Sequence, residues 1–264
     1  MEIRYRIADP TGNITVLVTS QIPADKRAEV AAFLLKTEPE VQQLGFVSEP
    51  EGECSADLQV DMAGGEFCGN ASLSAAALYA LGHSIEKVNA RLKVSGAENF
   101  VSVAIEKIGT MVYNGCVSMP LPEEIFPVDI ELGERHVGFP VVRFKGIVHG
   151  IYEGTLPKEE AEELTALLCK KTGADAAGIM QLDMEEKTIL PYVCVPGAGT
   201  GFWESSCASG TAAAGYYCYH KYNCSRFEQE FSEPAGVLKV SYDGRELLMT
   251  GNVVLGEEKI AYTE

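Results

Sequence analysis

Apolar and polar residues alternate along six segments in the first half of the chain, which is the pattern of half-buried strands. The segments are residues 3–7, 14–19, 56–62, 91–95, 99–106 and 111–119. A helical pattern covers residues 24–36, where Val30, Phe33 and Leu34 share one face. Residues 69–81 form a second helical segment that is rich in small residues and apolar almost all round. Such a helix is expected in the middle of a fold and not on its surface.

The same order of elements begins again after a proline-rich break at residues 120–127. Residues 155–171 are predicted to be a helix, because Thr155 can cap its start, Pro157 fits its first turn and Gly173 ends it. Residues 208–221 form another small-residue helix. Strands are predicted around these helices at residues 141–148, 176–182, 188–195, 237–242 and 246–255. Each half therefore reads strand, amphipathic helix, strands, apolar helix, strands.

Weak sequence similarity supports an internal repeat. The run S-A-A-A-L-Y followed by His83 parallels the run T-A-A-A-G-Y followed by His220, and Cys68 and Cys207 each open the apolar helix of their half. The pattern predicts an α/β (α+β) chain of two similar domains. The first spans residues 1–119, joined by the last strand at about residues 252–264, and the second spans residues 120–251.

The charge of the chain restricts its partners. It has 21 Lys and Arg against 38 Asp and Glu, a net charge of −17, and no visible cluster of basic residues. Such a chain repels phosphate backbones and anionic lipid, so we expect neither a nucleic-acid partner nor a membrane partner. The N-terminal segment lacks a signal-peptide pattern and no stretch approaches 18 apolar residues. We therefore expect a cytoplasmic protein with reduced thiols.

Eight cysteines, none in a C-x-x-C pair, are a further unusual feature. This spacing gives no support for a zinc ribbon or a thioredoxin-like site. Cys218, His220 and Cys224 lie close in sequence, but on a predicted aromatic-rich helix, and we expect no metal there. Most of the thiols are expected to be small buried hydrophobic groups.

Cys68 and Cys207 differ from the others because each stands at the start of a buried helix. The first N–H groups of a helix have no intrahelical partner and, with the helix dipole, favour negative charge. They would lower the pKa of a thiol at that position and could also hold a substrate carboxylate. If the two helices faced each other, the two sulfurs would flank the α-carbon of the bound substrate. That arrangement suits proton removal on one face and proton return on the other.

The motifs E-F-C-G-N-A at residues 66–71 and E-S-S-C-A-S-G-T at residues 204–211 resemble the two cysteine motifs of the diaminopimelate epimerase-like family of amino-acid racemases and epimerases. The resemblance extends to T-G-N at residues 11–13 and G-I-V-H at residues 146–149, and so to nearly the whole chain. Within the family, W-E-S-S-C at residues 203–207 is most similar to the histidine racemases. The resemblance implies two pseudo-symmetric domains, each a barrel-like, mostly antiparallel sheet around a central helix. It also implies a homodimer that works without a cofactor.

By this resemblance Cys68 and Cys207 are the two catalytic bases. The backbone N–H groups of four residues would bind the substrate α-carboxylate, namely Gly69, Asn70, Gly210 and Thr211. Asn13 matches an asparagine that contacts substrate. The alternative for both cysteines is a purely structural thiol.

The departures from the diaminopimelate epimerase pattern concern the distal end of the substrate. Ile147 replaces an asparagine, and Ala198 and Gly199 align with a Glu-Arg pair whose arginine would clamp a distal carboxylate. Asp175 and Gln59 align with two further distal-binding asparagines. A pocket without the arginine and with an added aspartate should reject a distal carboxylate and accept a neutral or cationic side chain.

The substrate is accordingly predicted to be a single amino acid with a basic or polar side chain, such as histidine. Trp203 could line an imidazole pocket or be a core aromatic, and Glu204 could bind the substrate amine or be a solvated turn residue. His149 could support the site or be a satisfied structural group, and Asp175 could equally be a surface carboxylate. No metal ligand set is predicted.

Three other functions stay open at this stage. One is diaminopimelate epimerase itself, which would act on a substrate with a distal carboxylate. Another is an inactive family member that serves as a small-molecule binding protein. The third is a redox sensor in which Cys68 and Cys207 form a disulfide.

Overall fold

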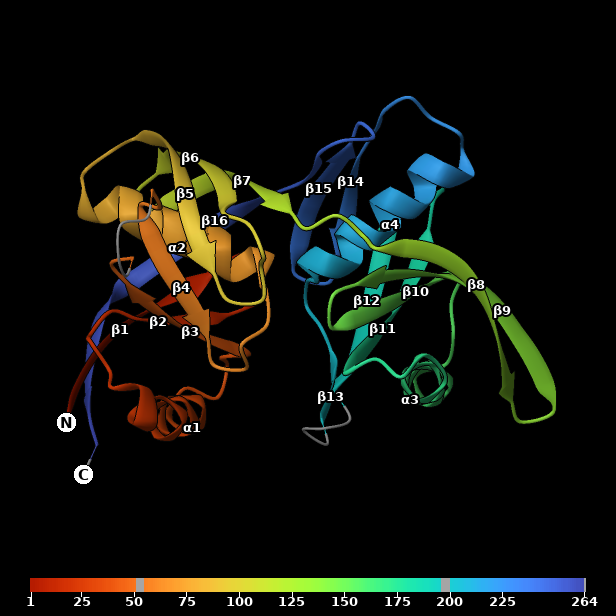
Figure 1. Cartoon of the computed structure of the whole chain (residues 1–264), viewed down its shortest axis with the longest axis horizontal. Coiled ribbons are helices and arrows are strands. Elements are labelled where there is room, and N and C mark those ends of the chain that lie inside the picture. The colour runs from red at the N-terminus through yellow and green to blue at the C-terminus, as the bar shows by residue number, and fades with distance from the viewer. Residues whose placement is uncertain (51–54, 196–199, 264) are drawn as a thin grey trace. The chain divides into compact units, whose positions relative to one another are not determined.

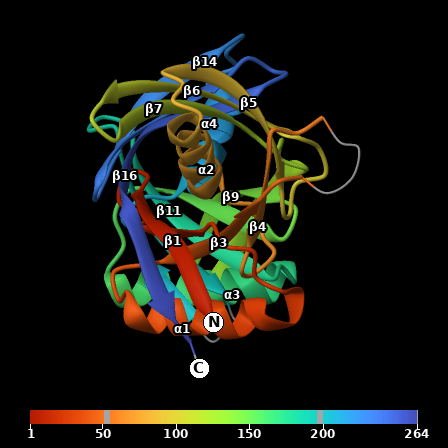
Figure 2. The same cartoon turned by 90° about the vertical axis from the view of Figure 1, so that its left-hand side faces the viewer.

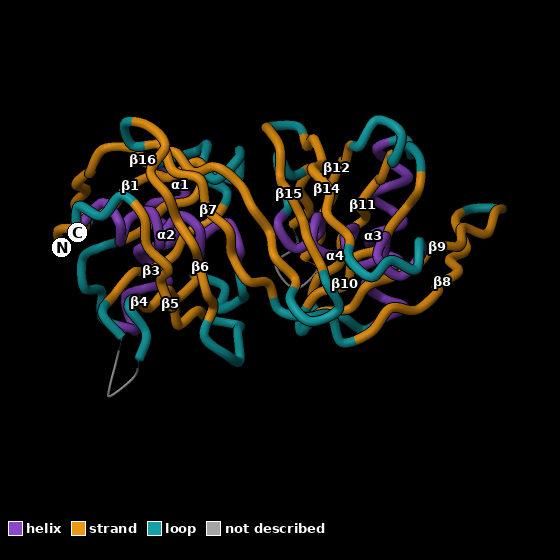
Figure 3. Tube along the Cα trace, turned by 90° about the horizontal axis from the view of Figure 1, so that it is seen from above, coloured by secondary structure: helices purple, strands orange, loops and turns teal. Residues whose placement is uncertain are grey.

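The structure is a computed structural model that describes residues 1–50, 55–195 and 200–263 (Figure 1). The chain divides into two compact units. Unit 1 comprises Met1–Ser118 and Thr250–Glu264, and unit 2 comprises Met119–Met249. Strands are the main regular element of each unit, and helices are few (Figure 3).

Unit 1 is an eight-stranded closed barrel. Its strands follow the order β1-β2-β3-β4-β5-β6-β7-β16, and β1 also pairs with β16, which closes the ring. The β2–β3 and β4–β5 pairs are parallel, and the β1–β2, β3–β4, β5–β6 and β6–β7 pairs are antiparallel. The strands are β1 (Glu2–Asp9), β2 (Thr15–Val18), β3 (Gln43–Ser48), β4 (Leu58–Met62), β5 (Lys87–Val94), β6 (Val101–Gly109), β7 (Val112–Met119) and β16 (Leu247–Tyr262).

Two helices cover opposite faces of this barrel wall. Helix α2 (Gly69–Gly82) lies within the ring of strands (Figure 2), and its residues from Gly69 to Ala77 are all buried. This burial explains why the helix has no polar face. Helix α1 (Arg27–Thr37), which follows the short helix η1 (Ala24–Lys26), packs on the outside of the barrel through Val30 and Leu34.

Unit 2 is a curved sheet with a helix on each face. Its strand order is β8-β9-β10-β11-β12-β14-β15 and then the first residues of β16, and β13 pairs with β12. Along β11, Ile179 belongs to the core beneath α3 (Lys158–Thr172), while Met180 lies against Gly210 of α4 (Ala208–Lys221). The strands are β8 (Glu124–Leu132), β9 (Arg135–Phe144), β10 (Ile147–Glu153), β11 (Ala176–Asp183), β12 (Thr188–Val195), β13 (Thr200–Trp203), β14 (Phe227–Glu233) and β15 (Gly236–Tyr242).

The α+β class and the barrel of unit 1 confirm the coarse fold prediction, and α2 and α4 begin and end within one residue of expectation. The single strand predicted at residues 141–148 is wrong. The chain turns at residues 145–146, so this segment ends β9 and begins β10. Strands β3, β8, β13 and β14 were not predicted. In the described part of the chain, every helix is too short or too polar to span a membrane.

Candidate active site

Cys68 occupies the N-cap position of α2. Its backbone is extended, with φ −132° and ψ 114°, and its sulfur accepts the N–H of Ala71 at 3.3 Å. The N–H of Ser72 is already bonded to the Cys68 carbonyl. Among the described residues, the N–H groups of Gly69 and Asn70 have no acceptor, so two donors at this helix start are available to an anion.

A neutral amide contacts the Cys68 sulfur. Gln43, at the start of β3, places Oε1 2.6 Å from Cys68 Sγ. Asn13 contacts the residue that precedes Gln43, because its Nδ2 donates to Gln42 Oε1 at 3.1 Å. Asn13 and Asn70 are at most 2% exposed, and their Oδ1 atoms have no hydrogen-bond partner among the described residues. An amide can accept from a thiol or donate to a thiolate, so Gln43 suits either protonation state of the sulfur.

Gln59 is not part of this cluster. Its Nε2 donates to the carboxylate of Asp61 at 3.1 Å and 3.2 Å, and Asp61 forms an ion pair with Arg27 of α1 at 2.7 Å. Gln59 and Asp61 therefore share the face of β4 that α1 covers, whereas Cys68 opens the helix inside the barrel.

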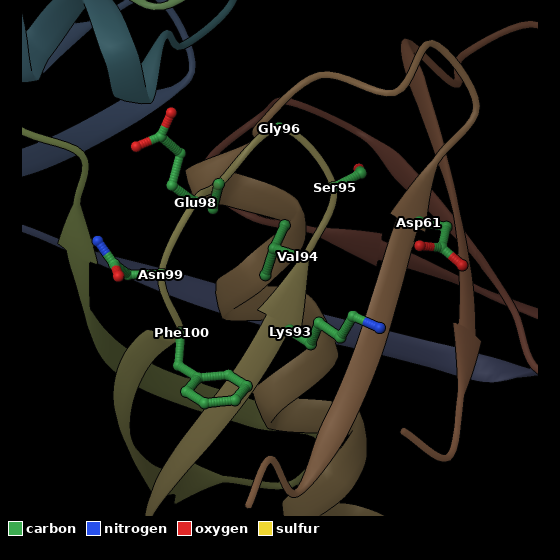
Figure 4. A pocket seen from close by; sticks show the side chains of 9 residues that line it. Asp61, Lys93, Val94, Ser95, Gly96, Glu98, Asn99 and Phe100 are labelled. Atoms are coloured by element: carbon green, nitrogen blue, oxygen red, sulfur yellow. The ribbon is translucent and has the colours of Figure 1, made fainter. Parts of the chain in front are cut away.

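The loop between β5 and β6 supports the segment before Cys68. The Ser95 hydroxyl donates to the Glu66 carbonyl at 2.9 Å, and Gly96, at φ +73°, lies so close that a Cβ there would be 2.3 Å from the Phe67 nitrogen. The same loop lines an open pocket of about 510 Å³ in unit 1 (Figure 4). In Figure 4 the Lys93 side chain extends toward the strand that carries Asp61. Cys68 is not among the residues that line this pocket.

Cys207 repeats the geometry of Cys68 at the start of α4. Its backbone has φ −132° and ψ 101°, and its sulfur accepts the N–H of Gly210 at 3.3 Å. The N–H of Thr211 is bonded to the Cys207 carbonyl at 2.8 Å. The predicted carboxylate donors Gly210 and Thr211 thus already have acceptors. The N–H groups of Ala208 and Ser209 have none among the described residues, and we regard them as the available pair in unit 2.

Two carboxyl groups distinguish Cys207 from Cys68. Glu204 shares a side-chain hydrogen bond with the Cys207 thiol, and Glu233, at the end of β14, accepts the Cys207 N–H at 2.7 Å. Burial, the Glu204 charge and hydrogen bond, and the Glu233 charge raise the pKa of Cys207 well above its ordinary value. The lowered thiol pKa expected from the helix start is therefore wrong for Cys207, since burial, helped by the nearby Glu204, outweighs the helix dipole.

His149 on β10 reaches the same helix start through Ser209. Its Nε2 lies 2.9 Å from Ser209 Oγ, which in turn is 3.6 Å from the Cys207 sulfur. The imidazole is fully buried, and burial lowers its pKa to about 3. It is therefore neutral at physiological pH. Gly178 on β11 leaves room for the imidazole ring, because a Cβ at position 178 would lie 2.7 Å from His149 Nδ1.

Two other candidates lie elsewhere in unit 2. Trp203 donates from Nε1 to Glu162 of α3 at 3.0 Å and packs against the α3 core, so its ring belongs to the α3 side of the sheet. Asp175 is exposed and, with Ile147, lines a small pocket of about 190 Å³. The predictions made for Ala198 and Gly199 fall outside the described residues, as does Cys54, one of the eight cysteines.

Sequence reasoning missed four residues that contact the two cysteines or their helix starts. Gln43 and Glu233 are at strand ends that had not been predicted, while Ser209 and Ala208 stand inside the motif but were not assigned a role. In the described part of the chain there is no group of three or more His, Cys, Asp or Glu residues that could hold a metal ion.

Comparisons with known proteins identify the family of this chain. Residues 2–261 match the family described as the histidine racemase CntK N-terminal domain. A histidine racemase of Fusobacterium nucleatum is 31% identical over 261 residues, which cover 96% of this chain and 94% of that protein. A histidine racemase of Staphylococcus aureus is 26% identical over 244 residues, which cover 90% and 88% of the two chains.

Solved structures share the fold at low sequence identity. A hydroxyproline epimerase from Agrobacterium vitis has a TM-score of 0.70 at 12% identity and covers 98% of this chain and 92% of its own. A protein from Pseudomonas aeruginosa described as an epimerase also has a TM-score of 0.70, at 14% identity, and covers 99% and 100% of the two chains.

Proposed function

Because this chain belongs to the histidine racemase family and is an isomerase, we propose that it interconverts the two enantiomers of histidine, with Cys68 and Cys207 as the two bases. The observation that carries the proposal is the matched geometry of the two cysteines. Each caps a buried helix, each sulfur accepts the N–H three residues on at 3.3 Å, and each helix start leaves two backbone donors available.

In this mechanism each turnover moves one proton onto a sulfur and another off a sulfur. The thiolate of one cysteine takes the α-hydrogen, so the C–H bond breaks and an S–H bond forms. The carbanion then takes the proton of the other thiol on the opposite face. After the turnover, the cysteine that was a thiolate is a thiol and the cysteine that was a thiol is a thiolate. No electron transfer is involved, and we propose that no cofactor takes part.

The helix-start N–H groups hold the substrate carboxylate and stabilise the charge that develops next to it. Gly69 and Asn70 serve in unit 1, and Ala208 and Ser209 serve in unit 2. The Oδ1 atoms of Asn13 and Asn70 are buried acceptors that would otherwise stay unsatisfied, and they suit the substrate ammonium group.

Glu204 is a second candidate for the ammonium group, since burial raises its pKa to about 7 and a bound cation would favour its charged form. His149 orients Ser209 at the helix start. Histidine is favoured as substrate because the named relatives are histidine racemases and because Ile147 stands where diaminopimelate epimerases carry a distal-binding asparagine.

The organisation of the whole chain is part of the proposal. We propose that units 1 and 2 are two pseudo-symmetric domains of the diaminopimelate epimerase type. Besides the two capping cysteines, each unit has a hydroxyl, of Ser72 or Thr211, that donates to the cysteine carbonyl. We further propose that the enzyme is a cytoplasmic homodimer.

Solvent exchange in deuterated water tests the mechanism. The wild type should racemise L-histidine and D-histidine with incorporation of deuterium at the α-carbon, whereas Cys68→Ser and Cys207→Ser should lose racemisation by at least about a thousandfold. Each of these variants should still exchange the α-hydrogen of only one enantiomer, because one base remains. Cys116→Ser, on β7, is the matched control and should stay active.

Three outcomes would overturn parts of the proposal. Racemisation that survives in both active-site variants would exclude the two-base mechanism. Turnover of diaminopimelate but not of histidine would exclude the substrate assignment. Binding of histidine without any exchange would indicate a binding protein.

A further inference from the structure

Glu233 is a buried carboxyl group directly beneath the start of α4. It is 7% exposed, and its Oε2 accepts the backbone N–H of Cys207 at 2.7 Å. Its Oε1 contacts the hydroxyl of Thr211. The turn that follows Glu233 is tied to the same segment, because the N–H of Ala235 donates to the Ser205 carbonyl at 3.0 Å. The end of β14 therefore fixes the loop that carries Cys207.

The hydrogen bonds around the Thr211 hydroxyl are all satisfied when Glu233 is protonated. The Thr211 hydroxyl lies 2.9 Å from the Cys207 carbonyl, which can only accept. A hydroxyl has one hydrogen, so it cannot donate to that carbonyl and to the Glu233 oxygen at once. If Glu233 carries a proton, its O–H donates to Thr211 Oγ1, and Thr211 donates onward to Cys207. Every contact then has one donor and one acceptor.

We propose that Glu233 is a positioning residue for the isomerisation and acts as a neutral carboxylic acid that holds the Cys207 helix start ready for the substrate carboxylate. This inference rests on the proposed function, because Cys207 must be a catalytic base. A neutral acid completes the hydrogen bonds of the loop without placing a negative charge beside the carboxylate site. An ionised Glu233 would repel the substrate carboxylate and would also disfavour the Cys207 thiolate.

The surroundings of Glu233 agree with a neutral group. Burial and the charge of Glu204, from the segment after β13, raise the pKa of Glu233. The hydrogen bonds that Thr211 and the Cys207 N–H can give to its ionised form lower the pKa, and the result is about 8. The titratable groups near this carboxyl group in the described residues are Glu204 and Cys207, with the neutral His149 on the far side of Ser209. Glu233 consequently ionises as the pH rises through 8.

Glu233→Gln and Glu233→Ala test the proposal together. Glutamine keeps both hydrogen bonds and cannot ionise, so the variant should have a kcat/KM within about threefold of the wild type at pH 7. At pH 9, one unit above the pKa of Glu233, the wild type should fall about tenfold relative to this variant. Glu233→Ala should lose at least about tenfold at every pH. Exposed Glu230 on the same strand offers the control Glu230→Gln, which should follow the wild type throughout.

Infrared difference spectra provide a readout that does not depend on turnover. The wild type minus Glu233→Gln spectrum should show the carbonyl band of a protonated carboxyl group at pH 7, and this band should disappear by pH 10. Absence of the band would overturn the proposal. So would a loss of activity in Glu233→Gln as large as in Glu233→Ala, or a pH profile of Glu233→Gln identical to that of the wild type. If the wild type racemises no amino acid, the proposed function fails, and the infrared result still decides the state of Glu233.

Discussion

The two proposed bases have different surroundings. Cys68 faces a neutral amide, Gln43, whereas Cys207 faces two carboxyl groups, Glu204 and Glu233. A helix N-terminus stabilises a negative charge by about 0.3–1 kcal/mol when exposed and up to about 2 kcal/mol when partly buried. Burial of a charged group costs more than this, since it shifts a pKa by up to about 3–5 units. In the proposed mechanism we therefore expect Cys207 to be the thiol in the resting enzyme, the form that donates a proton.

Removal of the Glu204 charge should make Cys207 more reactive. In a Cys68→Ala background, Glu204→Gln is expected to lower the pKa of Cys207, because it removes the negative charge that disfavours the thiolate. Alkylation of Cys207 by iodoacetamide at pH 8, followed by mass spectrometry of its peptide, should then be about tenfold faster. Glu230→Gln in the same background is the control. An unchanged rate would show that Glu204 does not act on the sulfur.

His149 makes the stability of the protein depend on pH. Its pKa is about 3 in the folded state and about 6.5 in the unfolded chain, so only the unfolded chain takes up this proton as the pH falls below 6.5. The contribution of a neutral His149 to stability is complete above pH 6.5. It should be lost by about 1.4 kcal/mol per pH unit between pH 6 and pH 4.

Urea unfolding of the wild type and of His149→Gln measures this effect. The free energy of unfolding of the wild type should fall relative to the variant over that pH range. The exposed His220 gives the control, His220→Gln, which should show no such difference. Parallel pH dependences of the wild type and His149→Gln would mean that the imidazole takes up its proton over the same pH range in the folded protein as in the unfolded chain.

At the scale of elements, the position of Cys68 depends on a loop that contributes no proposed catalytic side chain. The β5–β6 loop holds the segment before Cys68 through Ser95, and the close approach at Gly96 leaves no room for a side chain. Backbone atoms cannot move aside as the end of a flexible side chain can. A substitution at Gly96 should therefore displace residues 66–67 and, with them, the start of α2.

Gly96→Ala and Gly133→Ala separate this displacement from simple backbone strain. Both glycines have positive φ, +73° and +60°, so alanine costs about 1–2 kcal/mol at either position. Only Gly96 has neighbours that a Cβ would meet; nothing lies within 4 Å of a Cβ at Gly133. We expect kcat/KM for histidine to fall at least about tenfold in Gly96→Ala and to stay within about twofold in Gly133→Ala. Equal effects in the two variants would contradict this role of the loop.

Elements with a strong local pattern could be predicted from sequence, whereas those without one could not. Helices α2 and α4 are apolar and small-residue-rich over their full lengths, and their ends were predicted within one residue. Strand β8 contains Pro127, which normally argues against a strand, but β8 is the last strand of its path and, among the described strands, pairs with β9 alone. At such an edge the missing N–H costs no ladder hydrogen bond.

The candidate site was predictable where its residues lie within the cysteine motifs. Gly69 and Asn70 were placed correctly at an open helix start, and Glu204 lies beside Cys207. Gln43 and Glu233 could not be found, since strand pairing brings them to the cysteines from distant parts of the sequence. Gln59 was assigned by position alone, and strand alternation places it on the α1 side of β4.

At the scale of the whole molecule, the net charge of −17 acts on substrates before they bind. It repels anionic substrates and attracts cationic ones. Salt weakens both effects, because the Debye length is about 10 Å at 0.1 M salt. Histidine is a zwitterion without net charge at pH 8 and gains a positive side chain below its ordinary pKa of about 6.5. The KM for histidine can therefore be measured with the substrate in two charge states, and its response to salt reports the electrostatic field of the protein.

We expect the KM for histidine to change by less than about twofold between 20 and 300 mM KCl at pH 8, because the substrate has no net charge there. At pH 6 a large share of the histidine is cationic, and the KM should rise about threefold or more over the same salt range, because screening weakens the attraction. Initial rates of racemisation by circular dichroism give both values, and sucrose at matched osmolarity controls for effects other than charge. Equal salt dependence at the two pH values would mean that the acidic surface does not affect substrate capture. The backbone donors at the two helix starts would then determine affinity without help from the field of the molecule.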